Sequence, residues 1–231
     1  MSPRAVAAAF NNAEWCDLVC RTHGAVTAFT TGAWVSETRS PPAYPDAVTL
    51  HRSVPTDELL ARIDTSAGCS VKDSFTSLDL SGHGFQVLFD AEWIHRPGDG
   101  GVPRPAAAAL GWRVVEGVDE LEAWATAHGD GPVFRPELLD DPRVAVVFLP
   151  GDADGGVAAG GVGNRSGDVV GLSNVFAVSA EPDAVWAGAS AVLSARFPGL
   201  PLVGYQRGAG LAAAHRAGFS SVGALRVWLK A

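Results

Sequence analysis

The chain has little lysine, cysteine and methionine, and no long hydrophobic run. Of its 17 basic residues only Lys72 and Lys230 are lysines, and 25 acidic residues bring the formal net charge to −8. Nonspecific nucleic-acid binding needs clustered basic side chains on the phosphates, so we expect no nucleic-acid partner. No window reaches the roughly 18 apolar residues of a membrane helix, and the N-terminus lacks a signal-peptide pattern. We therefore expect no membrane partner.

The three cysteines are Cys16, Cys20 and Cys69. Their number is odd, and no cysteine or histidine pair near them has the spacing of metal ligands. This usage is typical of reduced thiols inside a cell. We therefore expect a cytoplasmic protein without a metal.

The length of 231 residues is long for one small domain and short for two ordinary ones. Segment 97–108 holds three prolines and three glycines and is the best linker in the chain. It divides the sequence into an N-terminal α/β region, residues 1–100, and a C-terminal domain, residues 109–231.

Beyond this linker, strands and helices are expected to mix. The hydrophobic patterns predict strands at 111–116, 144–150, 156–167, 169–179, 201–207 and 221–229. They predict helices at 118–129, 135–142, 181–197 and 210–218. A three-strand meander combined with strand–helix–strand crossovers indicates an α/β fold with a mixed sheet.

The N-terminal region shows a similar mixture. We expect helices at 4–22 and 56–66, strands at 25–35 and 46–51, and a hairpin over 78–95 that contains a long strand at 85–95. In outline, 45–95 repeats the end of the C-terminal pattern, and both stretches close with a tryptophan near the end of a strand, Trp93 and Trp228. The N-terminal region is either a degenerate second copy or an unrelated α/β extension.

The C-terminal order resembles the GNAT superfamily of acyl-CoA-dependent N-acetyltransferases. The pieces DPRVAVVFL, GVAAGGVGNRSG and VVGLSNVFAVS look like the second to fourth strands of that fold. The Ala-Gly-Phe at 217–219, followed by the strand with Trp228, looks like the turn after its fourth helix. The resemblance implies a GNAT-like fold, acetyl-CoA or another acyl-CoA as co-substrate, and an amine acceptor on a small molecule or peptide. A degenerate tandem of two such halves follows if the N-terminal copy is real.

The resemblance also implies where the acyl-CoA binds. The pantetheine arm would pair with the backbone of Phe176, Ala177 and Val178, and the pyrophosphate would sit at the start of the next helix. Gly188 and Ser190 align with the small positions of the family's phosphate loop. The sequence departs from that loop at Val185, where the family has Arg or Gln.

Acidic residues near the phosphates are a second departure. Glu181 and Asp183 precede or begin the helix and would repel phosphate, although they also stabilise a helix N-terminus. Ala214 stands where the family often has a tyrosine as general acid, so Tyr205 on the neighbouring strand is the candidate. Both readings of the acidic turn, cofactor binding and helix stabilisation, stay open.

Candidate bases lie in the N-terminal region. Strand alternation places Asp90 and Glu92 on one face with Ile94, where a carboxylate could deprotonate an amine. A polar sheet edge that prevents aggregation explains the same pattern.

Two further stretches of the N-terminal region are candidates for contacting the substrate. Trp34, Arg39 and Tyr44 flank a proline-rich segment that fits either a ligand-contacting loop or a rigid connector. Lys72, the only interior lysine, has a role that Arg cannot fill or forms a solvated pair with Asp73. The two functions considered are an N-acyltransferase and a GNAT-derived binding protein without catalysis, either of which is compatible with a homodimer.

Overall fold

The computed structural model describes residues 2–98, 110–151 and 156–231. The chain forms two compact units. Unit 1 takes the residues up to Trp93 together with Val222–Ala231, and unit 2 takes Ile94–Ser221. Most of the predicted linker 97–108, and the predicted boundary between 100 and 109, lie outside the described residues.

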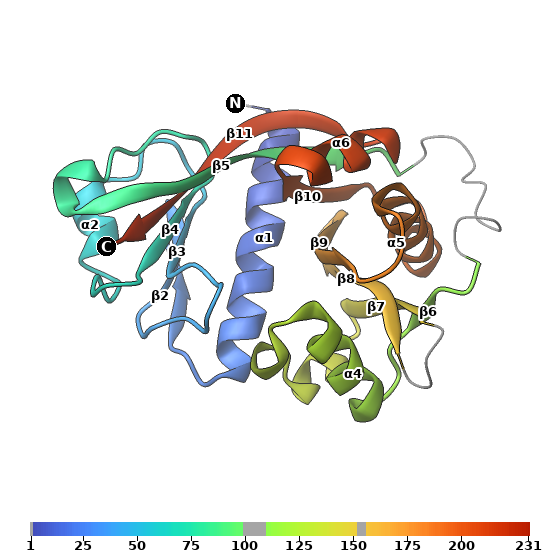
Figure 1. Cartoon of the computed structure of the whole chain (residues 1–231). Coiled ribbons are helices and arrows are strands. Elements are labelled where there is room, and N and C mark those ends of the chain that lie inside the picture. The colour runs from blue at the N-terminus through green and yellow to red at the C-terminus, as the bar shows by residue number, and fades with distance from the viewer. Residues whose placement is uncertain (1, 99–109, 152–155) are drawn as a thin grey trace. The chain divides into compact units, whose positions relative to one another are not determined.

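Unit 1 contains a mixed sheet (Figure 1). Its helices are α1 (Pro3–Thr22), α2 (Thr56–Leu60) and the short 3₁₀ helix η1 (Ser81–His83). Its strands are β1 (Thr27–Phe29), β2 (Ala33–Ser36), β3 (Ala47–Thr49), β4 (Ser70–Asp73) and most of β5 (Phe85–Arg96) and β11 (Ser220–Lys230). The pairs β1/β2 and β2/β3 are antiparallel, β3/β4 is parallel, and β11 pairs antiparallel with β4. The last strand of the chain, β11, therefore belongs to the sheet of unit 1, which also contains the N-terminal residues.

The two faces of this sheet follow strand alternation. Trp34 and Val48 point to the side of α1, where they pack with Ala13, Cys16 and Cys20. The alternate residues of β2 and β3 pack on the other side with Leu59 of α2.

Unit 2 has the order predicted from the sequence up to α6, whereas the final predicted strand, 221–229, is β11 and belongs mostly to unit 1. Its elements are β6 (Arg113–Val114), α4 (Val118–His128), η2 (Gly131–Val133), η3 (Pro136–Asp140), β7 (Val144–Pro150), β8 (Val157–Ser166), β9 (Val169–Ala177), α5 (Pro182–Arg196), β10 (Leu202–Gln206) and α6 (Gly208–Arg216). Neighbouring strands from β6 to β9 are antiparallel, whereas β10 runs parallel to β9. The fold class, a mixed α/β sheet, is confirmed.

Helices cover both faces of this sheet. Gly160 of β8 faces Trp124 of α4, and Gly163, three positions further along the strand, faces Leu193 of α5. Positions an odd number apart lie on opposite faces of a strand, so α4 and α5 pack on opposite faces. The core around α5 joins Trp186, Leu193, Phe197 and residues of β7, β9, β10 and α6.

The two units share one pattern of pairing. In each, three antiparallel strands lead through a helix to a fourth strand that lies parallel to the third: β1, β2, β3, α2 and β4, and β7, β8, β9, α5 and β10. A long strand follows each set, β5 in one case and β11 in the other. This order fits the tandem reading of the sequence.

Three local predictions were wrong. The strand predicted at 25–35 is two strands, because the Thr30 hydroxyl accepts the N–H of Ala33 and forms a turn. The helix predicted at 56–66 ends at Leu60. The hairpin predicted over 78–95 lacks its first strand, because the Leu80 carbonyl accepts the N–H of both His83 and Phe85 in a 3₁₀ turn.

None of the described helices has both the length and the apolar content required to cross a bilayer.

Gly204 lets β10 approach β9 closely. A Cβ built at this position would lie 2.6 Å from the carbonyl oxygen of Leu172, a backbone atom that cannot move aside without moving the strand. We predict that Gly204→Ala lowers the free energy of unfolding by roughly 1–3 kcal/mol, measured by urea denaturation. Gly131→Ala is the control, because a Cβ there meets nothing within 4 Å. Equal stability of the two variants would contradict the close packing of β9 and β10.

Candidate functional site

A β-bulge interrupts β9 in unit 2. Val162 of β8 pairs with Ser173 and Gly160 pairs with Phe176, so one residue of β8 opposes two residues of β9. Within the bulge Asn174 has φ +52°, a left-handed conformation that Asn tolerates better than most residues. Bulges bend a strand and increase its twist, and they are common beside active sites.

Beyond Gly171, which precedes the bulge, β9 and β10 no longer pair. Their parallel pairing covers only Val170 with Leu202 and Gly171 with Val203. The N–H of Val178 donates to Ala158 of β8 at 2.8 Å. Backbone groups alternate in direction along an antiparallel pair, so Ala177 directs its N–H and C=O away from β8. On the side of β10, the end of β9 therefore presents a backbone edge that pairs with no other described strand.

This edge carries the residues that the resemblance assigned to the pantetheine arm. Phe176 is partly buried, whereas Ala177 and Val178 are exposed, Val178 to 60%. The prediction that these residues contact the acyl donor therefore agrees with their accessibility, although no contact with a donor tests it.

An aromatic cluster supports Phe176 from the side of α4. The ring of Phe176 lies 5.2 Å from Trp124 and 5.3 Å from His128, both in edge-on geometry, and those two rings stack on each other at 5.2 Å. Burial lowers the pKa of His128 below its ordinary value of 6.5, and the nearby Asp130 opposes this only in part. The cluster fixes the side chain at the start of the open edge.

An ion pair joins the beginning of α5 to the end of α6. Arg216 donates from Nε and Nη2 to the two carboxylate oxygens of Asp183, both at 2.6 Å. These hydrogen bonds lower the pKa of Asp183 and raise that of Arg216. The sequence showed the acidic residue but not its partner, which stands 33 positions later. Arg216 thus places a cation beside Asp183 in the first turn of α5.

Gly188 and Ser190 lie inside α5, beyond its first turn. A Cβ on Gly188 would overlap the indole of Trp112, so this position is small because a tryptophan packs against it. Ser190 is fully buried. Their assignment to the acyl donor stays a prediction.

Tyr205 lies on β10, partly buried, in the same unit as the open edge. Ala214 of α6 is fully buried. The neighbouring His215 places Nε2 at 2.9 Å from the Ser221 hydroxyl.

The two candidate bases belong to β5 in unit 1. Arg226 of β11 holds Asp90 through two hydrogen bonds of 2.7 and 3.1 Å, which lower the pKa of Asp90. A carboxylate stabilised in this way is a weaker base. Glu92 is partly buried on the same strand.

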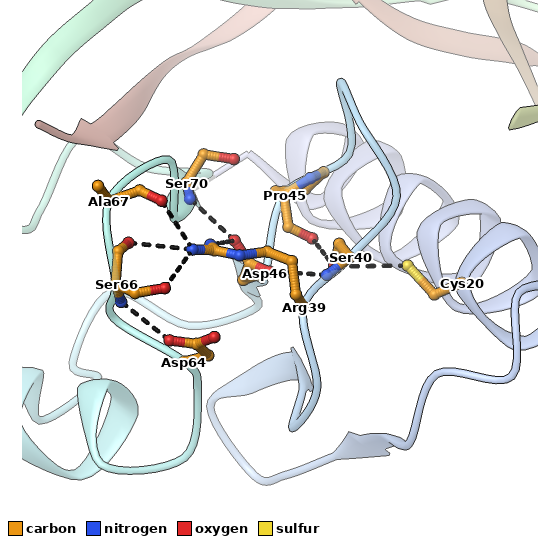
Figure 2. Close-up of polar contacts among 9 residues, drawn as sticks. All are labelled: Cys20, Arg39, Ser40, Pro45, Asp46, Asp64, Ser66, Ala67 and Ser70. Atoms are coloured by element: carbon orange, nitrogen blue, oxygen red, sulfur yellow. Dashed lines mark hydrogen bonds and ion pairs between the residues drawn. The ribbon is translucent and has the colours of Figure 1, made fainter.

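A buried carboxylate organises the proline-rich segment of unit 1, as Figure 2 shows. Asp46 accepts the backbone N–H of Ser40 and Ser70 at 2.9 Å each and a hydrogen bond from Arg39 at 3.0 Å. The other terminal nitrogen of Arg39 donates to the Ser66 and Ala67 carbonyls. Arg39 therefore joins two loops, as expected for the rigid-connector alternative.

Trp34, Tyr44 and Lys72 are also built into unit 1. Trp34 is fully buried and donates from Nε1 to Asp17 at 2.9 Å. Tyr44 packs partly buried against the cluster under α1. Lys72 is 4% exposed and donates from Nζ to Asn12 at 2.7 Å, so the solvated-pair alternative was wrong. A role of these residues in substrate binding stays a prediction.

A cavity of unit 1 was missed by the sequence analysis. It has a volume of about 410 Å³ between the start of β2, the loop before α2 and α2 itself. Its polar lining includes Thr30, His51, Glu58 and Arg62. Its lining comes from three stretches, 30–35, 51–55 and 58–62, which no local sequence pattern joins.

The thiols give no sign of reactivity. All three cysteines are free and buried, and burial raises the pKa of Cys16 to about 11 and of Cys20 and Cys69 to about 12. Thiols of this kind stay protonated and are poor nucleophiles. Within the described ranges, no three His, Cys, Asp or Glu side chains are grouped so that they could hold a metal ion.

Comparison with known proteins gives structural but not sequence matches. No family model and no curated protein matches the chain. A GCN5-related N-acetyltransferase from Kribbella flavida is similar over 100% of this chain and 96% of that one, with a TM-score of 0.66 and 17% identity.

Two further structures agree with this match. A protein assigned to the GNAT acetyltransferase family, from Novosphingobium aromaticivorans, has a TM-score of 0.55 and 14% identity, covering 94% of this chain and 96% of its own. A conserved protein of unknown function from Staphylococcus epidermidis has a TM-score of 0.62 and 9% identity, covering 89% and 94%. The resemblance to GNAT proteins is confirmed at the level of the fold.

Asp46 is predicted to be required for folding. Asp46→Asn replaces one accepting oxygen with an NH₂ group that repels the N–H donors around it. We expect a loss of roughly 3–5 kcal/mol in unfolding free energy by urea denaturation, as for a broken buried ion pair. Glu37→Gln is the control, because it removes an Arg–carboxylate pair that is exposed and should cost under about 1 kcal/mol. Similar losses in both variants would show that the Asp46 network does not organise the loops.

His128 is predicted to make stability depend on pH. Its pKa is lower in the folded chain than in the unfolded one, so the unfolded chain binds the proton more readily. The contribution of neutral His128 to the free energy of unfolding is complete above about pH 6.5. It is lost as the pH falls from there through the pKa of His128 in the folded chain. We expect the free energy of unfolding, measured by urea denaturation, to decrease less between pH 8 and pH 5.5 in His128→Phe than in the unchanged protein. This variant keeps an aromatic ring but has no titrating group at position 128. An NMR titration that placed the pKa of His128 at or above 6.5 would contradict this account.

Proposed function

We propose that this protein is an N-acyltransferase that moves an acetyl or other acyl group from coenzyme A to an amine of a small molecule or peptide. The observation that carries the proposal is the unpaired edge of β9 after the bulge at Asn174. The GNAT fold of the solved relatives agrees with it, but a fold alone does not determine function.

The open edge fits a ligand that contains amides. The N–H and C=O of Ala177 point sideways from β9, as backbone groups do when they bond to a neighbouring strand. An extended arm that carries amides can pair with them as an added strand does. Val178 adds exposed apolar surface beside them. Acetyl-CoA would supply here a thioester whose carbonyl carbon an amine can attack.

The beginning of α5 fits phosphate only if the negative charge of its acidic residues is offset. Free N–H groups and the helix dipole favour an anion there, but Glu181 and Asp183 disfavour it. Arg216 offsets one of these charges, and Nη1 of its guanidinium, which the two bonds to Asp183 do not use, can donate to a phosphate oxygen. Gly188 and Ser190 lie beyond this turn, so they would influence donor binding by allowing α5 to pack closely against its neighbours.

The proton transfers are assigned to side chains that remain to be tested. The phenol of Tyr205 can donate a proton to the leaving thiolate. Glu92 is the preferred base, since Arg226 holds Asp90 as a carboxylate. For the acceptor we retain Trp34, Arg39, Tyr44 and Lys72 as candidate contacts, and the net charge of −8 favours a cationic amine.

The proposal includes a cytoplasmic location, supported by three free cysteines. The runner-up is a binding protein with the same open edge and no catalysis, which the buried Ala214 in place of a general acid favours.

Calorimetry with coenzyme A, followed by acetyl transfer to a panel of amines, tests the proposal. We expect binding in the micromolar range and transfer to at least one amine. Binding without transfer to any amine would favour the runner-up, and no binding at millimolar coenzyme A would exclude both.

Arg216→Gln provides a sharper comparison. It should weaken coenzyme A roughly ten-fold, because one charged contact to phosphate is lost, and leave S-acetylpantetheine, which has no pyrophosphate, unchanged. Arg135→Gln, an exposed arginine of the same unit, is the matched control. Equal loss for both ligands would show that Arg216 does not act on the phosphates.

A further inference from the structure

Three arginines surround a cavity of unit 2 that no part of the proposed reaction uses. The cavity has a volume of about 470 Å³. Arg143 comes directly before β7, Arg165 lies on β8 and Arg196 ends α5. The rest of the described lining is Pro142, Phe197, Pro198 and Leu200, so none of the described lining residues carries a carboxylate.

The positive charge of this cavity is only partly neutralised. Arg143 pairs with Asp141 at 2.7 Å, outside the lining. Arg165 donates from Nε to the Gly167 carbonyl at 3.3 Å, and Arg196 lies over the Phe197 ring at 5.1 Å. Neither Arg165 nor Arg196 has a carboxylate partner within the described part of the chain. In a protein of net charge −8, a cavity with two such guanidinium groups is a local region of positive potential.

The rest of the described lining is apolar, and Pro142 and Pro198 are its exposed members. Phe197 is 6% exposed and belongs to the core of unit 2, and Leu200 packs against that core. A bare inorganic anion would use the arginines but would leave this apolar surface in contact with water. A ligand that joins an anionic group to an apolar ring or chain would use both.

The cavity is separate from the predicted acyl-donor site. It lies at the end of α5, at Arg196, whereas the donor's phosphates are assigned to its beginning, at Pro182. At about 1.5 Å per residue the two ends of this helix are roughly 20 Å apart. The carbonyls at a helix end disfavour an anion, so binding here depends on the arginines.

We propose that this cavity binds a small organic anion, in which a phosphate or carboxylate group meets Arg165 and Arg196 and an apolar body lies on Leu200 and the two prolines, Pro142 and Pro198. Arg is suited to this role because its planar fork can donate two parallel hydrogen bonds to either group. The proposal does not depend on the acyltransferase activity.

Calorimetry on the full chain, without coenzyme A and at constant ionic strength, tests this site. The probes are phenyl phosphate, benzoate, inorganic phosphate and phenol. We expect at least one of the two aromatic anions to bind on the order of ten-fold more tightly than inorganic phosphate and phenol. Phenyl phosphate and benzoate distinguish a phosphate ligand from a carboxylate ligand.

Variants locate the binding. Arg165→Gln and Arg196→Gln should each weaken the aromatic anion on the order of ten-fold, whereas Arg135→Gln, an exposed arginine outside the cavity, should leave it unchanged. Thermal denaturation shows that each variant is folded. Three results would each overturn the proposal. The first is equal weakening in Arg135→Gln, and the second is a loss of binding in Arg216→Gln but not in Arg165→Gln. The third is no binding of either aromatic anion at 10 mM, a concentration roughly 100-fold above the dissociation constant of a modest site.

Discussion

The candidate site depends on a single backbone irregularity, the bulge of β9 at Asn174. Along its first half, β9 pairs with β8 on one side and with β10 on the other. Pairing with β10 ends at Gly171, just before the bulge, whereas pairing with β8 continues to Ala177. The extra residue then bends β9, and β10 itself ends at Gln206, so β10 does not pair with the backbone of Ala177. The open edge, the aromatic support of Phe176 and the position of α5 are all arranged around this divergence.

The two units share a pattern of pairing, but the lengths of their strands and helices differ. This difference explains why only unit 2 is assigned an acyl-donor site. In unit 1, β3 has three residues and α2 has five, whereas β9 has nine and α5 has fifteen. A strand of three residues has no length left to diverge from its neighbour, and a helix of little more than one turn has a weak dipole. Unit 1 instead contains a cavity beside α2 and a loop network held by Asp46. The two units therefore share a topology but not a binding surface.

Local sequence patterns predicted the elements of unit 2 well, because alternation and glycine or proline positions act over a few residues. The resemblance to the GNAT superfamily singled out Phe176, Ala177 and Val178 at the end of one of these strands, and their contact with an acyl donor stays a prediction. The patterns did not reveal partners that are distant in sequence: Arg216 for Asp183, 33 positions away, and Arg226 for Asp90, 136 positions away. They also interpreted Gly188 through a motif, although the structure explains its small size by contact with Trp112. The first strand of the predicted hairpin failed for a similar reason, since a 3₁₀ turn satisfies its backbone groups.

In the proposed complex, the backbone of β9 at Ala177 pairs with the acyl donor. Amide hydrogen exchange of this residue, measured with and without coenzyme A, is a direct test of that pairing. Val178 is an internal reference, because its N–H already donates to Ala158. The account predicts that coenzyme A slows the exchange of Ala177 strongly and changes Val178 little. Unchanged exchange at Ala177 under saturating coenzyme A would contradict it.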